Sequence, residues 1–121
     1  IRMMDRITQS VFSFKRKEIK ELLENPSDIE SLTKDIHYVL DLARKAPSAA
    51  NSQMWRFGFE NDYRSILVAM PSGYRHFKWE HPNMDIGICA CHIWLGLIDR
   101  NYNPDIEVLD DNGRAVFKIS F

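Results

Sequence analysis

Two stretches in the first third of the chain carry apolar residues at helical spacing. In residues 15–25 the apolar positions fall three and four apart, at Ile19, Leu22 and Leu23. Pro26 ends this segment, because the residue before a proline is pushed out of the α region. The pattern predicts a short helix over residues 15–25.

The second stretch opens with a helix start signal. Ser27 and Glu30 fit a capping box, in which the serine oxygen accepts from an early backbone N–H and the glutamate reaches back. An apolar stripe at 3.6-residue spacing follows, made of Leu32, Ile36, Val39, Leu40 and Ala43. Arg44 and Lys45 suit the negative end of the helix dipole, and Pro47 stops the helix. We therefore expect one helix from Ser27 to Lys45.

The period then changes from helical to alternating. Residues 47–53 are small and polar and predict a loop, whereas residues 55–60 alternate and predict a strand. A turn at Asn61-Asp62 and a second strand over residues 65–70 complete a hairpin. A second hairpin is predicted for residues 107–109 and 115–121, around the tight-turn pair Asn112-Gly113.

Between the hairpins lies a helix that is apolar nearly all round. Pro82 suits a first helical position, and residues 83–100 carry little polar face, which is typical of a buried helix. The order helix, helix, hairpin, helix, hairpin predicts an α+β fold with helices packed on an antiparallel sheet. The apolar circumference of residues 84–98 exceeds what one small domain covers, so we expect that the chain is not a monomer.

Composition narrows the class of protein. With 121 residues, 45% hydrophobic and 27% charged, the chain is predicted to be a single globular domain, residues 1–121. A net charge of −1 removes the electrostatic argument for nucleic acid, and residues 84–98 are too short to cross a bilayer. Two cysteines are too few for a disulfide scaffold, and we see no signal peptide, so we expect a reduced, cytoplasmic setting.

The first candidate site is the loop after the second helix. Its small residues let a flat ligand approach the backbone, and Ser48, Asn51 and Gln53 offer donors and acceptors to the edge of such a ligand. The alternative is an ordinary helix-to-strand turn, in which Ser and Asn satisfy their own backbone. Spacing alone leaves both interpretations open and gives the turn more weight.

The second candidate lies on the apolar helix. Asp85, Cys89 and His92 share one face and could hold a metal, or pair a nucleophile with a base. The sequence offers no fourth ligand and no oxyanion loop, so we expect a core helix with no metal and no catalytic side chain. Cys91 lies two positions from Cys89 and points to a different side, so the two cannot form a redox pair.

Two further segments carry less information. Residues 74–79 interleave aromatics with cations, which suits either stacking on a ring or capping the core. The basic cluster at residues 15–20 is interleaved with glutamates and predicts a solvated face.

Residues 43–57, from Ala43 to Phe57, resemble the flavin loop of the nitroreductase family. The family pattern runs Ala-Pro-Ser-x-x-Asn-x-Gln-Pro-Trp and then a strand; here Met54 stands where proline is usual. Residues 84–92 resemble the family's Asp-Ile-Gly core helix. The spacing of the two blocks is similar to that of the TM nitroreductases, in which one chain carries two halves and both blocks lie in the second half.

The resemblance implies an FMN-dependent oxidoreductase that passes hydride from NAD(P)H to nitroaromatic or quinone-type acceptors. FMN would lie in a cleft between two subunits or two halves, with its ring lined by Pro47, Ser48, Ala49, Asn51 and Gln53. No catalytic side chain is implied, because the flavin itself carries the hydride. The alternative is a non-catalytic flavin- or ligand-binding domain, or a dimerisation module.

The sequence departs from the family at the phosphate-binding motif. Family members hold the FMN phosphate with Arg-x-Ser-x-Arg, whereas this chain reads Ser10-Val11-Phe12-Ser13-Phe14, with Phe12 in place of arginine. Either the phosphate-binding motif has degenerated, or the chain is the second half of a longer protein. The chain begins with Ile rather than Met, which favours the second explanation. We therefore expect either a homodimer or a missing N-terminal half.

Overall fold

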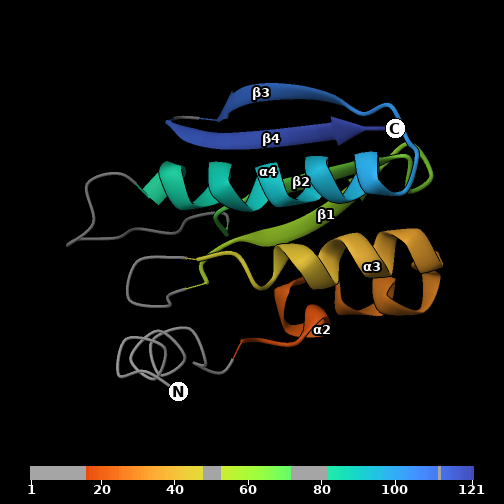
Figure 1. Cartoon of the computed structure of the whole chain (residues 1–121). Helices are drawn as coiled ribbons and strands as arrows, with labels where there is room; N and C mark the ends of the chain where they lie inside the picture. Colours follow the sequence, from red (N-terminus) through yellow and green to blue (C-terminus); the bar gives the residue numbers. More distant parts are fainter. Residues whose placement is uncertain (1–15, 48–52, 72–81, 112) are drawn as a thin grey trace, which may run out of the picture.

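The computed structural model describes residues 16–47, 53–71, 82–111 and 113–121 (Figure 1). Its elements in chain order are α2 (Ile19–Leu22), the 3-10 helix η1 (Pro26–Ser31), α3 (Lys34–Ala43), β1 (Arg56–Glu60), β2 (Ser65–Ala69), α4 (Pro82–Asp99), β3 (Asp105–Asp111) and β4 (Arg114–Ser120). The predicted α+β class and both predicted hairpins are confirmed.

The two hairpins join into one sheet with the strand order β1-β2-β4-β3, and all three pairings are antiparallel. At the join, Ser65 lies opposite Ser120, and their hydroxyls share a hydrogen bond of 2.8 Å. Strands β2 and β4 are therefore central, and β3 forms an edge. All seven residues of β3 are exposed.

Helix α4 lies against one face of this sheet, with α3 beside it (Figure 1). Gly96 allows α4 to approach α3 closely, because a Cβ there would lie 3.3 Å from a methyl group of Val39, which is tighter than ordinary contact. At Gly87 a Cβ would lie at an ordinary contact distance, 3.5 Å, from the ring of Phe117 on β4. The core between these layers includes the fully buried side chains of Trp55, Phe57, Ile66, Ile93, Leu97 and Ile119.

The predicted capping box is wrong, and the single helix predicted over residues 27–45 is two. Ser27 is held by Asn25, whose Oδ1 accepts from the backbone N–H and the hydroxyl of Ser27 at 3.3 and 2.8 Å. The chain becomes extended at Leu32 and then starts again as α3. The cap of α3 is Thr33, whose Oγ1 accepts from the backbone N–H of Ile36 at 3.2 Å.

The first predicted helix is also shorter than expected, because tertiary pairing ends it. Leu23 leaves the helix to form a parallel bridge with Phe57 at the edge of the sheet. The backbone N–H of Glu24 then donates to the Phe57 carbonyl at 2.9 Å. These residues therefore extend the edge of β1 rather than continue α2.

The turn between β1 and β2 is longer than the predicted Asn61-Asp62 pair. Asn61, Asp62 and Tyr63 all have left-handed backbone conformations, with φ of 53, 56 and 64°. Such conformations are uncommon in a residue as bulky as tyrosine. The Tyr63 hydroxyl donates to Asp28 at 2.8 Å, and its ring contacts Phe59 with centroids 5.2 Å apart. These contacts hold the strained residue in place.

Helix α4 is buried on one side only, although its nearly all-round apolar character is typical of a buried helix. Pro82 begins α4 as predicted, and the side facing the sheet and α3 is buried. Met84, Ile88, Leu95 and Ile98 are nevertheless 37–62% exposed. Within the part of the chain that the structure describes, no helix has the length and apolar character needed to span a membrane.

Candidate functional site

The predicted flavin loop connects α3 to β1, and the structure describes its two ends. Pro47, at the entry, is exposed, and Gln53, at the exit, is buried. Ser48, Ala49 and Asn51 lie outside the described residues, as do residues 74–79. The predicted contacts of these residues with a flavin therefore stay predictions.

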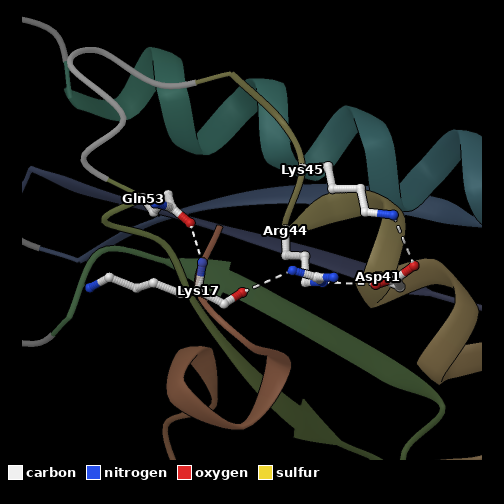
Figure 2. Close-up of polar contacts among 5 residues, drawn as sticks. All are labelled: Lys17, Asp41, Arg44, Lys45 and Gln53. Carbon is white, nitrogen blue, oxygen red and sulfur yellow. Dashed lines mark hydrogen bonds and ion pairs between the residues drawn. The ribbon is translucent and has the colours of Figure 1, made fainter. Parts of the chain in front are cut away.

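Gln53 fixes the exit of the loop. Its backbone is left-handed, with φ of 47°, and its side chain is only 3% exposed. The side-chain oxygen Oε1 accepts from the backbone N–H of Lys17 at 2.6 Å, across 36 positions of sequence (Figure 2). A buried amide in this position joins the segment before α2 to the start of β1.

Arg44 connects the start of the loop to Lys17 as well. Its Nη1 donates to the Lys17 carbonyl at 3.3 Å, and its Nε donates to Asp41 Oδ1 at 2.7 Å (Figure 2). Lys45 Nζ adds a 3.3 Å contact to the other oxygen of Asp41. The hydrogen bond from Arg44, followed by contacts from Lys45, holds the pKa of the Asp41 carboxyl below its ordinary value.

Both backbone polar groups of Lys17 are thus used by the two ends of one loop. We call this arrangement the Lys17 clamp: Gln53 on the N–H and Arg44 on the carbonyl. The Lys17 side chain extends away from Asp41 and Arg44 (Figure 2). Among the described residues it makes no ion pair.

Arg56 gives the loop exit a second support. Its Nη1 donates to the carbonyls of Gln53 and Trp55 at 3.1 and 2.7 Å. Burial lowers the pKa of this guanidinium from its ordinary value, because a cation is penalised when water is removed from it. The residue also lines an open cavity of about 460 Å³ with Leu23, Glu24, Pro71 and Arg114.

This cavity lies at the end of the sheet from which the loop enters β1. Arg114 begins β4 and donates to the Met70 carbonyl at 2.6 Å and to Asp111 at 2.8 Å. Arg56 begins β1, opposite Ala69 at the end of β2. The two arginines therefore brace the backbone at this end of the sheet.

Trp55 places a buried donor two residues after the loop. Its side chain is fully buried, and its indole N–H finds no acceptor among the described residues. Most buried polar groups in proteins are paired, and an unpaired one costs about 1–3 kcal/mol. An acceptor at this position would remove that cost.

The three polar residues of α4 occupy different surroundings. Asp85 and Cys89 are buried, whereas His92 is half-buried with its Nδ1 2.8 Å from the Ile88 carbonyl. The Cys89 thiol donates to the Ala43 carbonyl at 3.6 Å, and burial raises its pKa well above the ordinary value. Such a thiol is a poor nucleophile. The described residues contain no cluster of His, Cys, Asp or Glu side chains that could hold a metal.

The predicted separation of the two cysteines is confirmed, since Cys89 is buried and Cys91 is exposed. The Lys17 clamp, in contrast, was missed by sequence reasoning. The basic cluster predicts a solvated face, and Lys20 is indeed exposed, but Arg16 and Lys17 are half-buried. No local pattern signals contacts that span 27 and 36 positions.

Comparison with known proteins places the chain in the nitroreductase class. Residues 5–97 match the family described as "Putative TM nitroreductase", which is most of the chain. The chain therefore belongs to this family. The predicted resemblance is confirmed.

A solved structure supports the same assignment. It is a chain described as a "putative nitroreductase" from Thermotoga maritima, with 25% sequence identity and a TM-score of 0.65. The match covers 88% of the present chain and 42% of the Thermotoga chain. The present chain thus spans less than half the length of that relative. Among curated proteins, none matches the present chain.

Proposed function

We propose that this chain forms part of an FMN-dependent oxidoreductase that passes hydride from NAD(P)H to small acceptors, such as nitroaromatics or quinones. Family membership supports an oxidoreductase of the nitroreductase kind. The observation that carries the proposal is the Lys17 clamp, which holds both ends of the flavin-type loop to one residue. The clamp uses the side chains of Arg44 and Gln53, which stand at the two ends of the loop.

The described residues around the loop fit a ligand that is rich in acceptors and negatively charged. The buried indole N–H of Trp55 has no acceptor in this part of the structure, and the Lys17 ammonium has no described counter-ion. FMN offers ring carbonyls, hydroxyls and a phosphate, which suit such donors. When bound, the flavin would accept hydride from NAD(P)H and deliver it to the acceptor.

Within this proposal the loop residues have distinct roles. Pro47, Ser48, Ala49 and Asn51 line the flavin ring, where their small size and amide or hydroxyl groups suit close approach to a flat molecule. Gln53 is then chiefly a positioning residue, because its side-chain oxygen is engaged by the Lys17 N–H. The chain supplies binding and orientation rather than an acid or base.

Binding of the FMN phosphate requires residues beyond the loop. The family's arginine is replaced by Phe12, and the match covers 42% of the Thermotoga chain. We propose that the chain is one nitroreductase-like half and that a second half completes the FMN cleft, either from a longer protein or from a second copy. Two free thiols suit the reduced, cytoplasmic setting that belongs to this proposal.

The test is optical and uses the purified chain with added FMN. We expect a yellow protein that NAD(P)H bleaches and that a quinone or nitroaromatic recolours. Yellow protein that NAD(P)H leaves unbleached would support the non-catalytic flavin-binding alternative. Protein that stays colourless after gel filtration would contradict flavin binding by this chain.

A further inference from the structure

The cavity where the loop enters β1 brings two arginines together on one face of the sheet. Side chains alternate between the two faces along a strand. The Phe117 ring lies on the α4 side, so Arg114, three residues earlier on β4, points to the opposite side. Phe117 is paired with Val68, which is paired with Phe57. Arg56 directly precedes Phe57 on β1 and therefore also points away from α4.

Arg56 brings to this cavity a positive charge that no described carboxylate neutralises. Its guanidinium makes no ion pair among the described residues, and Glu21 acts on it only through space. Its Nη1 is held by the carbonyls of Gln53 and Trp55, whereas Nε and Nη2 meet no acceptor in the part of the chain that the structure describes. A half-buried cation with free N–H donors favours an anion on its open side.

Arg114 adds a second guanidinium whose position is fixed. Its Nη1 donates to the Met70 carbonyl at 2.6 Å, its Nη2 donates to Asp111 at 2.8 Å, and its side chain is 22% exposed. The charge of Arg114 is thus shared with a carboxylate, whereas that of Arg56 is not. Because backbone carbonyls already hold both guanidinium groups, little conformational freedom is lost when an anion binds to them.

The remaining lining of the cavity restricts the kind of anion. Leu23 and Pro71 supply apolar walls, and Glu24 supplies one carboxylate. This carboxylate lies over the sheet, since a Cβ at Gly58 would be 3.2 Å from Oε2 of Glu24. It disfavours a ligand with several negative charges. A volume of about 460 Å³ is that of a small-molecule site, so an apolar body with one anionic group fits the lining best.

We propose that this cavity binds a small organic anion, in which an apolar body carries one carboxylate or one phosphate ester. Arg56 is the recognising residue, and Arg114 is the second donor. The site lies on the face of the sheet opposite α4, and its residues are not those predicted to line the flavin ring. The proposal does not rest on flavin binding.

The test is an NMR titration of the purified chain with benzoate and with phenyl phosphate, followed through the backbone amide signals. Benzyl alcohol is the neutral control, because it has the same ring and no charge. We expect saturable shifts around Arg56, Arg114 and Leu23 with at least one of the two anions, and none with benzyl alcohol. The anion that binds more tightly distinguishes a carboxylate site from a phosphate-ester site.

Three variants separate this cavity from general surface charge. Arg56→Gln should weaken binding of the anion roughly tenfold or more, since it removes the unneutralised donor. Arg64→Gln makes the same charge change at the other end of β2, where the guanidinium lies over the Tyr102 and Phe121 rings, and should leave the affinity unchanged. Glu24→Gln removes the acid from the lining and should strengthen binding roughly threefold.

Melting curves check that the variants fold. If Arg56→Gln does not fold, the wild-type titration and the exposed change Glu24→Gln decide the matter. Addition of FMN should leave the bound anion in place. Displacement by FMN would show that the cavity is part of the flavin site and would overturn a separate site.

Three further results would also overturn the proposal. They are an absence of saturable shifts with both anions, a loss of affinity in Arg64→Gln as large as that in Arg56→Gln, and weaker binding in Glu24→Gln.

Discussion

At the scale of single residues, the side chain of Gln53 holds the loop exit through one hydrogen bond to a backbone amide. The bond is short, at 2.6 Å, and its oxygen is buried in a residue that is 3% exposed. Arg44 serves the entry in the same way, but through a carbonyl. The clamp thus uses the backbone of Lys17 and leaves its ammonium group for other contacts.

Replacing Gln53 by Leu should destabilise the chain by about 1–3 kcal/mol, because the Lys17 N–H loses its acceptor in a partly buried place. Urea denaturation of the two proteins measures the difference. Lys17→Ala is the matched control, since it removes the side chain and keeps the backbone clamp. If Lys17→Ala destabilises the chain as much as Gln53→Leu, the clamp does not act through the backbone.

The carboxyl of Asp41 should make stability depend on pH. Its hydrogen bond from Arg44 lowers its pKa below the ordinary value of 3.8, so the folded state favours the ionised form. The resulting stabilisation is fully present above the ordinary pKa and is lost as pH falls through the lowered value. The stability difference between wild type and Asp41→Asn should therefore shrink as pH falls below 3.8. A difference that stays constant from pH 7 into acid would contradict this account of the carboxyl.

At the scale of elements, the long periodic segments could be predicted and the element boundaries could not. Helix α4 and both hairpins follow from local pattern, because their periods extend over many residues. The predicted start of α3 was wrong, because Ser27 and Thr33 both resemble N-caps in the sequence and only the fold decides between them. The end of α2 was also not predictable, because Leu23 pairs with Phe57, a partner 34 positions away in the sequence.

The competing caps give a direct comparison. Thr33→Ala removes the acceptor at the start of α3 and should cost about 1 kcal/mol. Ser27→Ala is an exposed change whose hydroxyl only meets Asn25, so it should fall within about 0.5 kcal/mol of wild type. Thermal melts of both variants settle which residue caps the helix. A larger loss in Ser27→Ala would restore the predicted capping box.

At the scale of the whole molecule, the described residues form a four-stranded sheet with helices packed on one face, and α4 is left partly uncovered. The presence of a loop between α3 and β1 was predictable, because the helix before it and the strand after it follow local patterns, whereas its role as a flavin site stays a prediction. The clamp was not predictable, because it is made by residues whose spacing of 27 and 36 positions carries no local signal. The exposed side of α4 agrees with the expectation that one small domain does not cover the whole apolar circumference of residues 84–98. Apolarity all round a helix predicts burial but does not say whether the same chain provides the cover.

The central claim is that the loop after α3 serves a flavin, and titration of FMN against wild type and Asn51→Leu tests it most directly. If Asn51 contacts the flavin edge, the variant should bind FMN roughly ten- to a hundredfold more weakly. The melting temperature without flavin should change little, because a loop residue that serves a ligand adds little to the core. The ordinary-turn interpretation predicts the reverse. A lower melting temperature with unchanged FMN affinity would contradict the account.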